Sequence, residues 1–566
     1  MASYQNYPTE SFDSLKQMLH ASTERFGTKT LFMEKRNGTY ENVSFRTYCA
    51  HVNSLGTELL ARGFGGKRII VIGENCYNWV TAYMAVICGV GVVVPVDKEI
   101  PAEEICNIAR ISRAAAVIYS PKVAAKIEAL DESVEKISFD DLKTLIARGR
   151  ARMKSGDRSY LDAEIDNTAL AALIFTSGTT GVSKGVMLSH RNICFNLSQM
   201  CKMIYIGEKD VFLSVLPLHH CYECTCGFLC QVYRGCTVAF SEGLRYITKN
   251  MQEVKPTMML CVPLLLETMY QKVWANIRRQ GMEKKVLSAI KMTNAIHPEK
   301  LRIAAKKKVF STIHQSFGGR LRMLVSGGAP VDPTVLEGLR DLGISTRQGY
   351  GLTECAPIAA LNRDGLYNDA SAGLATPDTI LDIYDLQDDG TGEIRFKGDN
   401  VMLGYYEMPE ETARVIRGGW FYTGDLGYLD EKGFLFITGR KKNVIVTANG
   451  KNIFPEELET YLGRTNFVKE SVIVGYMNEK KHDYDIVALI HPDYEHLQEK
   501  YNPLTEEQLD LELKRAVAGV NAMVQSYKRI EAFVICKEEF PKNTSRKIKR
   551  AGLAEREYKN YLNKKS

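Results

Sequence analysis

The stretch KRIIVIGENCYNWVTAYMAVICGVGVVVPV, residues 67–96, decides the fold class. It opens with a short apolar run rich in β-branched residues, which is typical of a buried strand. The following NWVTAYMAVICGVG (78–91) has helical spacing and ends in glycine, and VVVPV (92–96) returns to a strand pattern. A strand, a helix and a second strand in this order predict a βαβ unit, and therefore a parallel sheet with helices on its faces.

The same alternation extends outward from this unit. PAEEICNIARISRA, from Pro101, begins with proline and two acids, which is a helix-start signature, and AAVIYS then returns to a strand. RMLVSGGAP predicts a strand and a turn before the helical VDPTVLEGLRDLG, and a strand-rich stretch runs over 381–436. ARGRARMKSGDRS (147–159) is polar and basic, so we expect a solvated connector there. After Gly439 helix and strand patterns alternate again, which predicts a small α+β domain.

Length and composition limit the function classes. A chain of 566 residues exceeds one ordinary domain, and its 45% apolar content is that of a folded globular protein. With 73 basic and 67 acidic residues the net charge is only +6, which gives no support for a nucleic-acid partner. The start MASYQNYPTE lacks a secretory pattern, and the longest apolar run, Met84 to Val96, is shorter than the ~20 residues that span a bilayer. We therefore expect a cytoplasmic protein whose 14 cysteines are reduced.

The strongest chemical signal is LIFTSGTTGVSKGVMLSHRN, residues 173–192. An apolar strand leads into consecutive hydroxyl and glycine residues, Thr176 to Gly181, and then into Lys184 and a predicted helix. Glycines let the backbone approach an anion, hydroxyls and amides donate hydrogen bonds, and the lysine adds a charge, so the pattern predicts a loop that cradles a polyphosphate. The alternative is a flexible linker, which the framing strand and helix disfavour. A Walker A loop is excluded because Gly185 follows Lys184.

This loop resembles the signature of the adenylate-forming superfamily, which includes acyl-CoA synthetases, adenylation domains of peptide synthetases and luciferases. Ser183 stands where the usual proline precedes the lysine. The later motifs follow in the order of that family: SGGAP (326–330), QGYGLTE (348–354), GWFYTGDLG (419–427), GRKKNVIVTANGKNIFPEELE (439–459) and PKNTSRKIKR (541–550). The resemblance implies a mixed α/β fold: a large N-terminal AMP-binding domain of doubly wound sheets with a strand-rich subdomain over 1–438, a hinge at 439–442, and a small mobile α+β lid domain over 443–566.

The resemblance also implies roles for particular residues. A carboxylate attacks the α-phosphate of ATP, so two anions must meet among cations and fixed donors. Lys547 would neutralise the two anions, His220 would line the acyl pocket, and Glu354 with Thr176 would hold Mg²⁺. The other implied ATP-binding residues are Ser177, Gly178, Thr179, Thr180, Gly181, Lys184, Gly328, Ala329, Pro330, Gln348, Gly349, Tyr350 as a plate for adenine, Gly351, Thr353 at the α-phosphate, Asp425 and Arg440 at the ribose, and Lys442. The chain departs from the family at Arg546, the usual glycine, and at Val446, a frequent lysine.

The cluster HHCYECTCGFLC, residues 219–230, is open to two interpretations. Two histidines and several cysteines suggest a metal or iron–sulfur site. The spacing fits no common ligand pattern, and the flanking residues are apolar. We therefore predict a buried helix whose cysteines act as small hydrophobic side chains and hold no metal.

PLHHCYE followed by NGKNIFPEELE resembles the bacterial long-chain fatty-acid–CoA ligases. This resemblance implies a long-chain fatty acid, ATP with Mg²⁺, and coenzyme A as substrates. A medium-chain or aryl acid, or an acyl-carrier protein as acceptor, is the alternative. A non-enzymatic binding relative is disfavoured because Lys547, Glu354 and Asp425 are all present. Membrane contact is expected to be weak and peripheral, since no basic amphipathic helix stands out, and the oligomeric state is left open.

Overall fold

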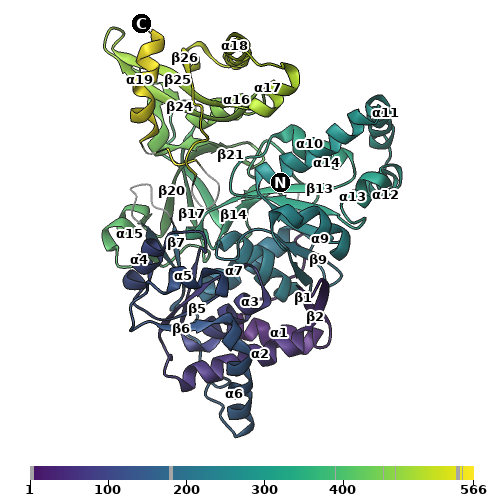
Figure 1. The fold of residues 1–566 in the computed structure, drawn as a ribbon, viewed down its shortest axis with the longest axis vertical. Helices are drawn as coiled ribbons and strands as arrows, with labels where there is room; N and C mark the ends of the chain where they lie inside the picture. The colour runs from purple at the N-terminus through teal and green to yellow at the C-terminus, as the bar shows by residue number, and fades with distance from the viewer. Residues whose placement is uncertain are drawn as a thin grey trace. The chain divides into compact units, whose positions relative to one another are not determined.

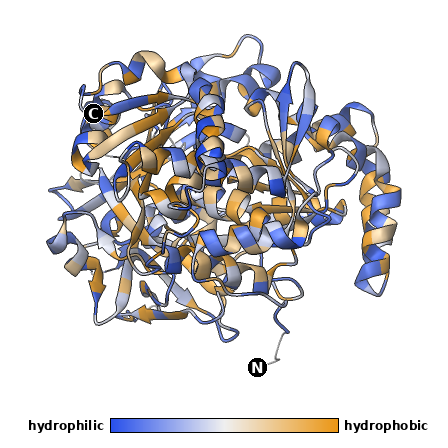
Figure 2. Cartoon of the chain, turned by 90° about the horizontal axis from the view of Figure 1, so that it is seen from below, coloured by the Kyte–Doolittle hydropathy of each residue, from blue (hydrophilic) through white to orange (hydrophobic). Residues whose placement is uncertain are grey.

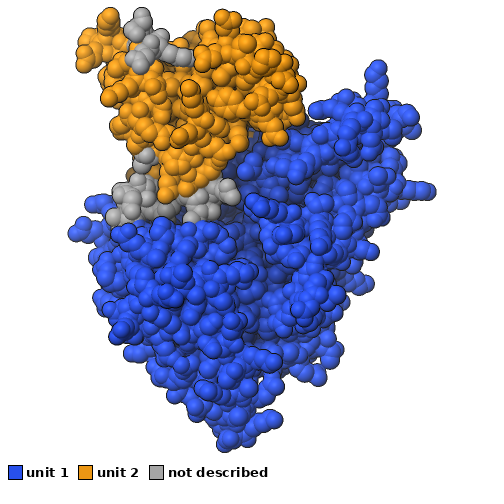
Figure 3. All heavy atoms as spheres, viewed as in Figure 1, with its two compact units in different colours: residues 1–381, 396–421, 431–435 blue, residues 382–395, 422–430, 436–566 orange. Residues whose placement is uncertain are grey.

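The structure, a computed structural model, describes residues 5–176, 183–388, 390–449, 451–465, 467–542, 548–550 and 552–565. It has the mixed α/β fold that the sequence predicts. The chain divides into two compact units (Figure 3). Unit 1 comprises Met1–Leu381, Phe396–Phe421 and Glu431–Leu435, and unit 2 comprises Asp382–Arg395, Tyr422–Asp430 and Phe436–Ser566.

The first sheet of unit 1 has the strand order β18-β8-β7-β4-β3-β5-β6. It confirms the βαβ unit predicted over 67–96, because β3 and β4 are parallel neighbours joined by α3. Parallel pairing relates β3, β4, β5, β6 and β7, whereas β8 and β18 are added antiparallel. The elements are β3 (Arg68–Ile72), α3 (Tyr77–Ala85), β4 (Val92–Val96), α4 (Ala102–Ser112), β5 (Ala114–Tyr119), β6 (Glu135–Ser138), β7 (Leu170–Thr176), β8 (Lys184–Ser189) and β18 (Gly404–Tyr405).

The second sheet of unit 1 has the order β15-β14-β13-β12-β11-β9-β10-β1-β2 (Figure 1). Its central strands are parallel and buried, as expected for a sheet with helices on both faces. Helices α9 (Ile247–Val254) and α14 (Pro333–Asp341) pack on it through residues such as Met251 and Leu336. The strands are β1 (Thr30–Arg36), β2 (Thr39–Ser44), β9 (Val211–Ser214), β10 (Thr237–Phe240), β11 (Met258–Cys261), β12 (Met323–Ser326), β13 (Ser345–Gly351), β14 (Ile358–Leu361) and β15 (Leu374–Ala375).

A helical excursion separates β11 from β12. It consists of α10 (Pro263–Arg279), α11 (Glu283–Asn294), α12 (Glu299–Val309) and α13 (Ser311–Ser316), drawn at the right of Figure 1. Trp274, Ile277, Val286, Ile290 and Phe310 form a small core of its own. The remaining faces of α11 and α12 are exposed.

The basic stretch 147–159 is one part of the fold that the sequence prediction gets wrong. Its first half belongs to helix α6 (Leu142–Lys154), which packs against α2 (Phe45–Ala61). Leu142, Leu145 and Ile146 supply the buried face just before the basic residues, which then occupy the solvent side. At Gly149 a Cβ atom would lie 1.7 Å from the Ser54 carbonyl oxygen, so glycine permits the close approach of the two helices.

The strand-rich stretch over 381–436 is confirmed. Its strands have the order β16-β17-β20-β19, with β21 also paired to β20, and the boundary between the two units passes through this sheet. They are β16 (Ile380–Tyr384), β17 (Gly392–Lys397), β19 (Ile416–Arg417), β20 (Trp420–Leu429) and β21 (Leu435–Arg440); helix α15 (Pro409–Val415) and the short helix η7 (Lys441–Asn443) lie nearby in the sequence.

The rest of unit 2 is the α+β arrangement expected after Gly439. Strands β24 (Val468–Asn478), β25 (Asp483–Pro492) and β26 (Ala532–Ile535) form its sheet. Neighbouring side chains of β24 face opposite cores: Ile473 packs with helices α16 (Pro455–Leu462) and α18 (Glu506–Met523), and Val472 packs with α19 (Leu553–Lys565). Throughout the described part of the chain, each helix is too short or too polar to cross a bilayer.

Candidate active site

The predicted phosphate loop connects two antiparallel strands. Thr176 ends β7 and Lys184 begins β8, and the two residues are partners in register. The Thr176 hydroxyl donates to the Lys184 carbonyl oxygen at 3.4 Å, and the Ser183 hydroxyl donates to Glu104 of α4 at 2.6 Å. These bonds anchor both ends of the loop. The loop residues named from the sequence, Ser177, Gly178, Thr179, Thr180 and Gly181, lie outside the described residues.

The sequence prediction of a helix directly after Lys184 is wrong. Strand β8 intervenes, and helix α7 (His190–Met203) begins only after Ser189. The reason is a local cap: the Ser189 hydroxyl accepts from the Asn192 amide, and the Asn192 side chain accepts from the Ser189 amide. This reciprocal capping fixes the start of the helix. The preceding KGVMLS extends along β7 instead.

The charge of Lys184 is paired in this structure. Its Nζ lies 2.7 Å from Glu411 Oε2 on α15 and 5.0 Å from the centre of the Tyr405 ring. The ammonium group lowers the pKa of the Glu411 carboxyl. A phosphate bound at this loop would therefore compete with Glu411 for the lysine. Sequence reasoning did not single out Glu411.

Glu354 is held in place by a residue that the sequence analysis missed. The Tyr405 hydroxyl donates to Glu354 Oε1 at 2.8 Å, and the Met402 amide donates to the Glu354 carbonyl oxygen at 2.8 Å. Burial, and then the neighbouring Glu354 carboxylate, raise the pKa of Tyr405, so the phenol remains a donor. Tyr405 reaches this point because β18 pairs with β8, a contact that no local sequence pattern reveals.

Glu354 and Thr176 have the chemistry that Mg²⁺ requires. Magnesium binds oxygen ligands and is usually held by one or two carboxylates together with substrate phosphates. Glu354 offers a carboxylate whose orientation Tyr405 fixes, and Thr176 offers a hydroxyl at the entrance to the phosphate loop. Among the residues that the structure describes, no group of three or more His, Cys, Asp or Glu side chains could hold a metal. A carboxylate and a hydroxyl are oxygen ligands of the kind that fit a magnesium ion bound together with substrate phosphates.

Two of the predicted nucleotide-binding motifs, SGGAP and QGYGLTE, lie next to each other. SGGAP follows β12 and QGYGLTE ends β13, and these strands are parallel neighbours with Ser326 opposite Gln348. Loops at the carboxyl ends of adjacent parallel strands meet at one sheet edge, the usual place for a ligand in such sheets. Gly328, Ala329 and Pro330 are exposed there, and Gly328 has a φ of +88°, which favours glycine.

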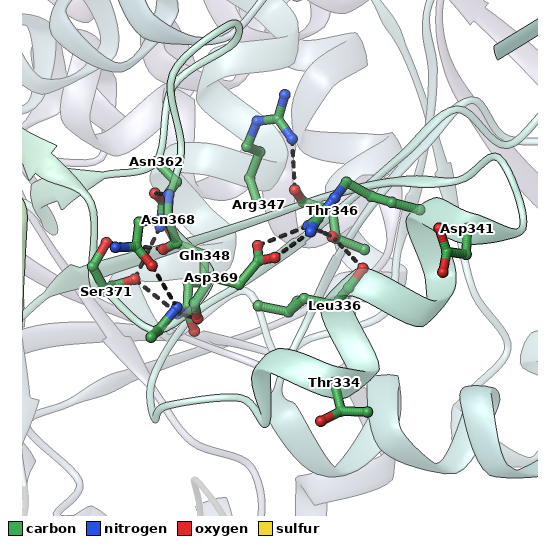
Figure 4. Close-up of polar contacts among 12 residues, drawn as sticks. Thr334, Leu336, Asp341, Thr346, Arg347, Gln348, Asn362, Asn368, Asp369 and Ser371 are labelled. Carbon is green, nitrogen blue, oxygen red and sulfur yellow. Dashed lines mark hydrogen bonds and ion pairs between the residues drawn. The ribbon is translucent and has the colours of Figure 1, made fainter. Parts of the chain in front are cut away.

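Gln348 connects these loops rather than standing free for a ligand. Its side-chain amide donates to the Asp369 and Ser371 carbonyl oxygens at 2.6 and 2.8 Å, and its Oε1 accepts from the Val331 amide at 3.3 Å (Figure 4). These bonds fix the position of the Gln348 side chain at the end of β12 and β13. Its contact with a nucleotide stays a prediction.

The aromatic and glycine residues of QGYGLTE are closely packed. Tyr350 is 9% exposed, and its ring centre lies 6.0 Å from that of Phe396. A Cβ atom on Gly351 would lie 2.0 Å from the Pro357 carbonyl oxygen, so only glycine fits. Gly349 lies opposite Leu361 of β14, and Thr353 begins the short helix η6 (Thr353–Cys355) that carries Glu354.

In unit 2 the residues implied for the ribose are together. Asp425 on β20 is 4% exposed, and its Oδ1 lies 3.0 Å from Arg440 Nε at the end of β21. Lys442 follows in η7, where burial and the charges of Arg440 and Arg550 lower its pKa. Lys547 lies outside the described residues.

The cysteine-rich stretch is a buried helix, as the sequence predicted. Residues Tyr222–Leu229 form a π-helix, η4, which continues into α8 (Cys230–Arg234). Its cysteines are buried, and burial raises the pKa of the Cys221 thiol to about 12. The adjacent His219 is buried and its pKa is lowered by burial, whereas His220 is partly exposed, with the two rings 4.1 Å apart. Of the pair, His220 is the more exposed.

The same helix contains a buried acid. Glu223 Oε1 accepts from the Ser214 hydroxyl at 2.6 Å, and burial raises the pKa of Glu223 to about 8, so the carboxyl is neutral at pH 7. Gly227 leaves room for it, because a Cβ there would lie 2.7 Å from Glu223 Cδ. The neighbouring Tyr222 packs its ring on Gly327, and its hydroxyl donates to the Val325 carbonyl oxygen at 3.0 Å. The helix that begins after His220 therefore contacts the SGGAP loop directly.

The fold is shared with enzymes of known structure. Among solved structures, Mycobacterium tuberculosis fatty acyl CoA synthetase aligns with a TM-score of 0.66 at 23% identity, over 96% of this chain and 98% of that one. ATP-bound MatB from Rhodopseudomonas palustris aligns with a TM-score of 0.73 at 23% identity, over 96% and 99%.

Sequence comparisons assign the family. The model of the AMP-binding enzyme family matches residues 19–406, and that of the AMP-binding enzyme C-terminal domain matches residues 442–564. Long-chain-fatty-acid–CoA ligase 5 of Rattus norvegicus is 30% identical over 507 residues, 82% of this chain and 73% of the relative. Long-chain-fatty-acid–CoA ligase FadD15 of Mycobacterium tuberculosis is 26% identical over 560 residues, 92% of each chain. The chain belongs to the family of AMP-binding enzymes.

Proposed function

We propose that the protein is an ATP-dependent acid–CoA ligase whose acid is a long-chain fatty acid. The position of Glu354 is the observation that best supports the proposed adenylation step. Tyr405 fixes its carboxylate at 2.8 Å, and it lies at the end of the loop that pairs with SGGAP across neighbouring strands. A carboxylate oriented beside a sheet edge built for a nucleotide suits phosphate activation.

In the first half-reaction two anions must meet, so the site must neutralise negative charge and need not transfer a proton. An oxygen of the fatty-acid carboxylate forms a bond to the α-phosphorus, the bond from that phosphorus to the bridging oxygen breaks, and pyrophosphate leaves with that oxygen. Lys184 would leave its ion pair with Glu411 and bind phosphate oxygens instead. Lys547 would bind the oxygens of the two approaching anions. Mg²⁺, held by Glu354 and Thr176 with the nucleotide, would supply positive charge to the phosphates.

The second half-reaction transfers the acyl group. The sulfur of coenzyme A loses its proton and bonds to the acyl carbon, and AMP leaves as the carbon–oxygen bond breaks. Burial lowers the pKa of His219 and keeps its ring neutral. His219 therefore adds no positive charge next to His220.

The choice of a long-chain acid is supported by the relatives. The rat and mycobacterial proteins are named long-chain-fatty-acid–CoA ligases, and the mycobacterial alignment extends over 92% of both chains. The buried, cysteine-rich helix behind His220 has the apolar character that an alkyl chain requires. A medium-chain or aryl acid, and an acyl-carrier protein as acceptor, remain alternatives within the same chemistry.

The test is acid-dependent exchange of labelled pyrophosphate into ATP, followed by thioester formation with coenzyme A. A series of saturated acids of increasing length should give exchange that rises toward the long-chain members. Glu354→Gln, which keeps the shape of the side chain, should abolish most exchange. Release of ADP would indicate a phosphotransferase, and binding of acid or nucleotide without exchange would indicate a non-catalytic protein. Either outcome would overturn the proposal.

A further inference from the structure

Glu411 pairs with two cations, and one of them is the lysine of the predicted phosphate loop. Its Oε2 lies 2.7 Å from Lys184 Nζ, and its Oε1 pairs with Arg414, three residues further along α15. The Lys184 side chain is 19% exposed and that of Glu411 is 32% exposed, whereas Arg414 is 69% exposed. The pair with Lys184 is therefore the more sheltered of the two, and salt and water screen it less.

Backbone contacts bring the start of α15 to this lysine. The Tyr406 amide donates to the Gly185 carbonyl oxygen at 2.7 Å, and the Thr412 hydroxyl accepts from the Tyr405 amide at 2.8 Å. Figure 2 shows hydrophilic residues gathered on the outer helices and loops of the chain and hydrophobic residues on the strands within it. Helix α15 belongs to the outer part, since none of its residues is buried. The carboxylate of Glu411 thus reaches the loop from a surface helix that the fold holds in place.

Lys184 has a second contact that carries no charge. Its Nζ lies 5.0 Å from the centre of the Tyr405 ring, and the hydroxyl of the same ring orients Glu354. An aromatic face attracts an ammonium group but accepts no ordinary hydrogen bond from it, so the three N–H donors of a lysine stay available to oxygen atoms. When the carboxylate of Glu411 withdraws, the ammonium group can remain over the ring and donate to a phosphate.

A phosphate and Glu411 compete for the same ammonium group. The affinity that Lys184 gives to a phosphate is therefore reduced by the strength of the ion pair that has to break. The displaced carboxylate keeps its pair with Arg414, so the exchange leaves no isolated charge behind. In the reverse direction, the return of Glu411 to Lys184 assists the departure of the bound phosphate.

We propose that Glu411 sets the affinity of the site for polyphosphates, weakening the binding of ATP and of pyrophosphate by occupying Lys184. The inference rests on the proposed function, because it requires that Lys184 binds phosphate oxygens. Glu411 acts through the lysine and contacts no reacting atom, so it is a positioning residue. An acid in this place limits how tightly the product pyrophosphate is held, at the cost of weaker binding of ATP.

The experiment is isothermal titration of the full chain with ATP and Mg²⁺ in the absence of an acid substrate, and separately with pyrophosphate and Mg²⁺. Glu411→Gln removes the charge and keeps the shape of the side chain. Its Kd for both ligands should fall by about fivefold, the upper range for a partly exposed ion pair. In steady-state assays the KM for ATP should fall with it, kcat should not rise, and pyrophosphate should inhibit at lower concentrations.

Glu410→Gln is the matched control. Glu410 is the exposed neighbour of Glu411 on the same helix turn, and its replacement removes the same charge. This variant should change the two Kd values by less than about twofold, the effect of a distant charge. Circular dichroism verifies that both variants are folded. Equal tightening in both variants, or an unchanged Kd in Glu411→Gln, would overturn the inference alone. Failure of the parent chain to bind ATP would overturn the proposed function and this inference with it.

Two double variants test whether the effect passes through the ion pair. Lys184→Gln should itself weaken ATP binding, and adding Glu411→Gln to it should then change little, because the pair is already lost. A fivefold effect that persisted without the lysine would mean that Glu411 repels the phosphates directly, and would overturn the proposal. Arg414→Gln should weaken ATP binding in the parent, where Glu411 then depends more on Lys184, but not in Glu411→Gln. Equal weakening in both backgrounds would overturn it too.

Discussion

Replacing Glu223 with glutamine should make the stability of unit 1 less dependent on pH. The Glu223 side chain is fully buried and is hydrogen-bonded through Oε1 to Ser214. Burial raises its pKa from 4.5 to about 8, so the folded protein keeps a proton that the unfolded chain releases. Because the folded pKa is the higher one, the stability contributed by this proton is complete below 4.5 and is lost as the pH rises through about 8.

The magnitude follows from the separation of the two pKa values. Each unit of difference corresponds to about 1.4 kcal/mol, so the unfolding free energy should fall by on the order of 5 kcal/mol between the unfolded and folded pKa values. Glutamine has the same shape, does not titrate, and keeps an oxygen for the Ser214 hydroxyl. Its amide would occupy the position of Oε2, which finds no hydrogen-bond partner among the described residues. This costs about 1–3 kcal/mol at every pH. The variant should therefore be no more stable than the parent near pH 5, and more stable near pH 8.

The assay can be confined to unit 1. The chain has three tryptophans, Trp79, Trp274 and Trp420, and all of them belong to that unit. Urea unfolding followed by tryptophan fluorescence over a series of pH values gives the midpoint for the parent and for Glu223→Gln. The exposed substitution Glu24→Gln is the control and should shift neither curve. A constant offset between parent and variant at all pH values would refute the reasoning, because it would mean that Glu223 is ionised in the folded state.

Four further substitutions test the site and the reaction. Tyr405→Phe removes the hydroxyl that orients Glu354 and should slow acyl-AMP formation by about tenfold or more without unfolding the protein; an unchanged rate would show that Glu354 is positioned without it. Lys547→Ala should cut acyl-AMP formation by at least ~10² while thioester formation from supplied acyl-AMP survives, and equal loss of both would contradict the role of the lysine. Lys442→Pro should retain acyl-AMP formation and lose thioester formation if the C-terminal domain turns about this residue, and intact CoA transfer would exclude it as the pivot. Elemental analysis should find no stoichiometric zinc or iron in the purified protein, and a metal that is lost in Cys224→Ser would show that the cysteine-rich helix binds one.

Local patterns in the sequence predicted most of the fold. The βαβ unit over 67–96 and helix α4, which begins at Ala102 directly after the predicted start at Pro101, depend on apolar spacing and helix-start residues, which lie within a few positions of each other. The two errors also have local explanations. Helix α6 takes its buried face from residues just before the basic stretch, and the start of α7 is fixed by a cap that lies beyond the phosphate loop.

The candidate site was only partly predictable. Asp425 and its partner Arg440 could both be named from motifs, whereas the partners of Glu354 and Lys184 come from other parts of the chain. Tyr405 reaches Glu354 through the pairing of β18 with β8, and Glu411 reaches Lys184 from α15.

The cysteine-rich helix has a consequence for the chemical reactivity of the protein. Thiols react with alkylating agents and oxidants as thiolates, and burial of Cys221, Cys224 and Cys226 both excludes reagents and suppresses ionisation. Modification of these residues must therefore wait for the wall of the site to open. The rate at which they become labelled under native conditions would measure how often η4 separates from the strands behind it. Burial in this way protects these cysteines from oxidants, and they serve as built-in reporters of local opening at the candidate site.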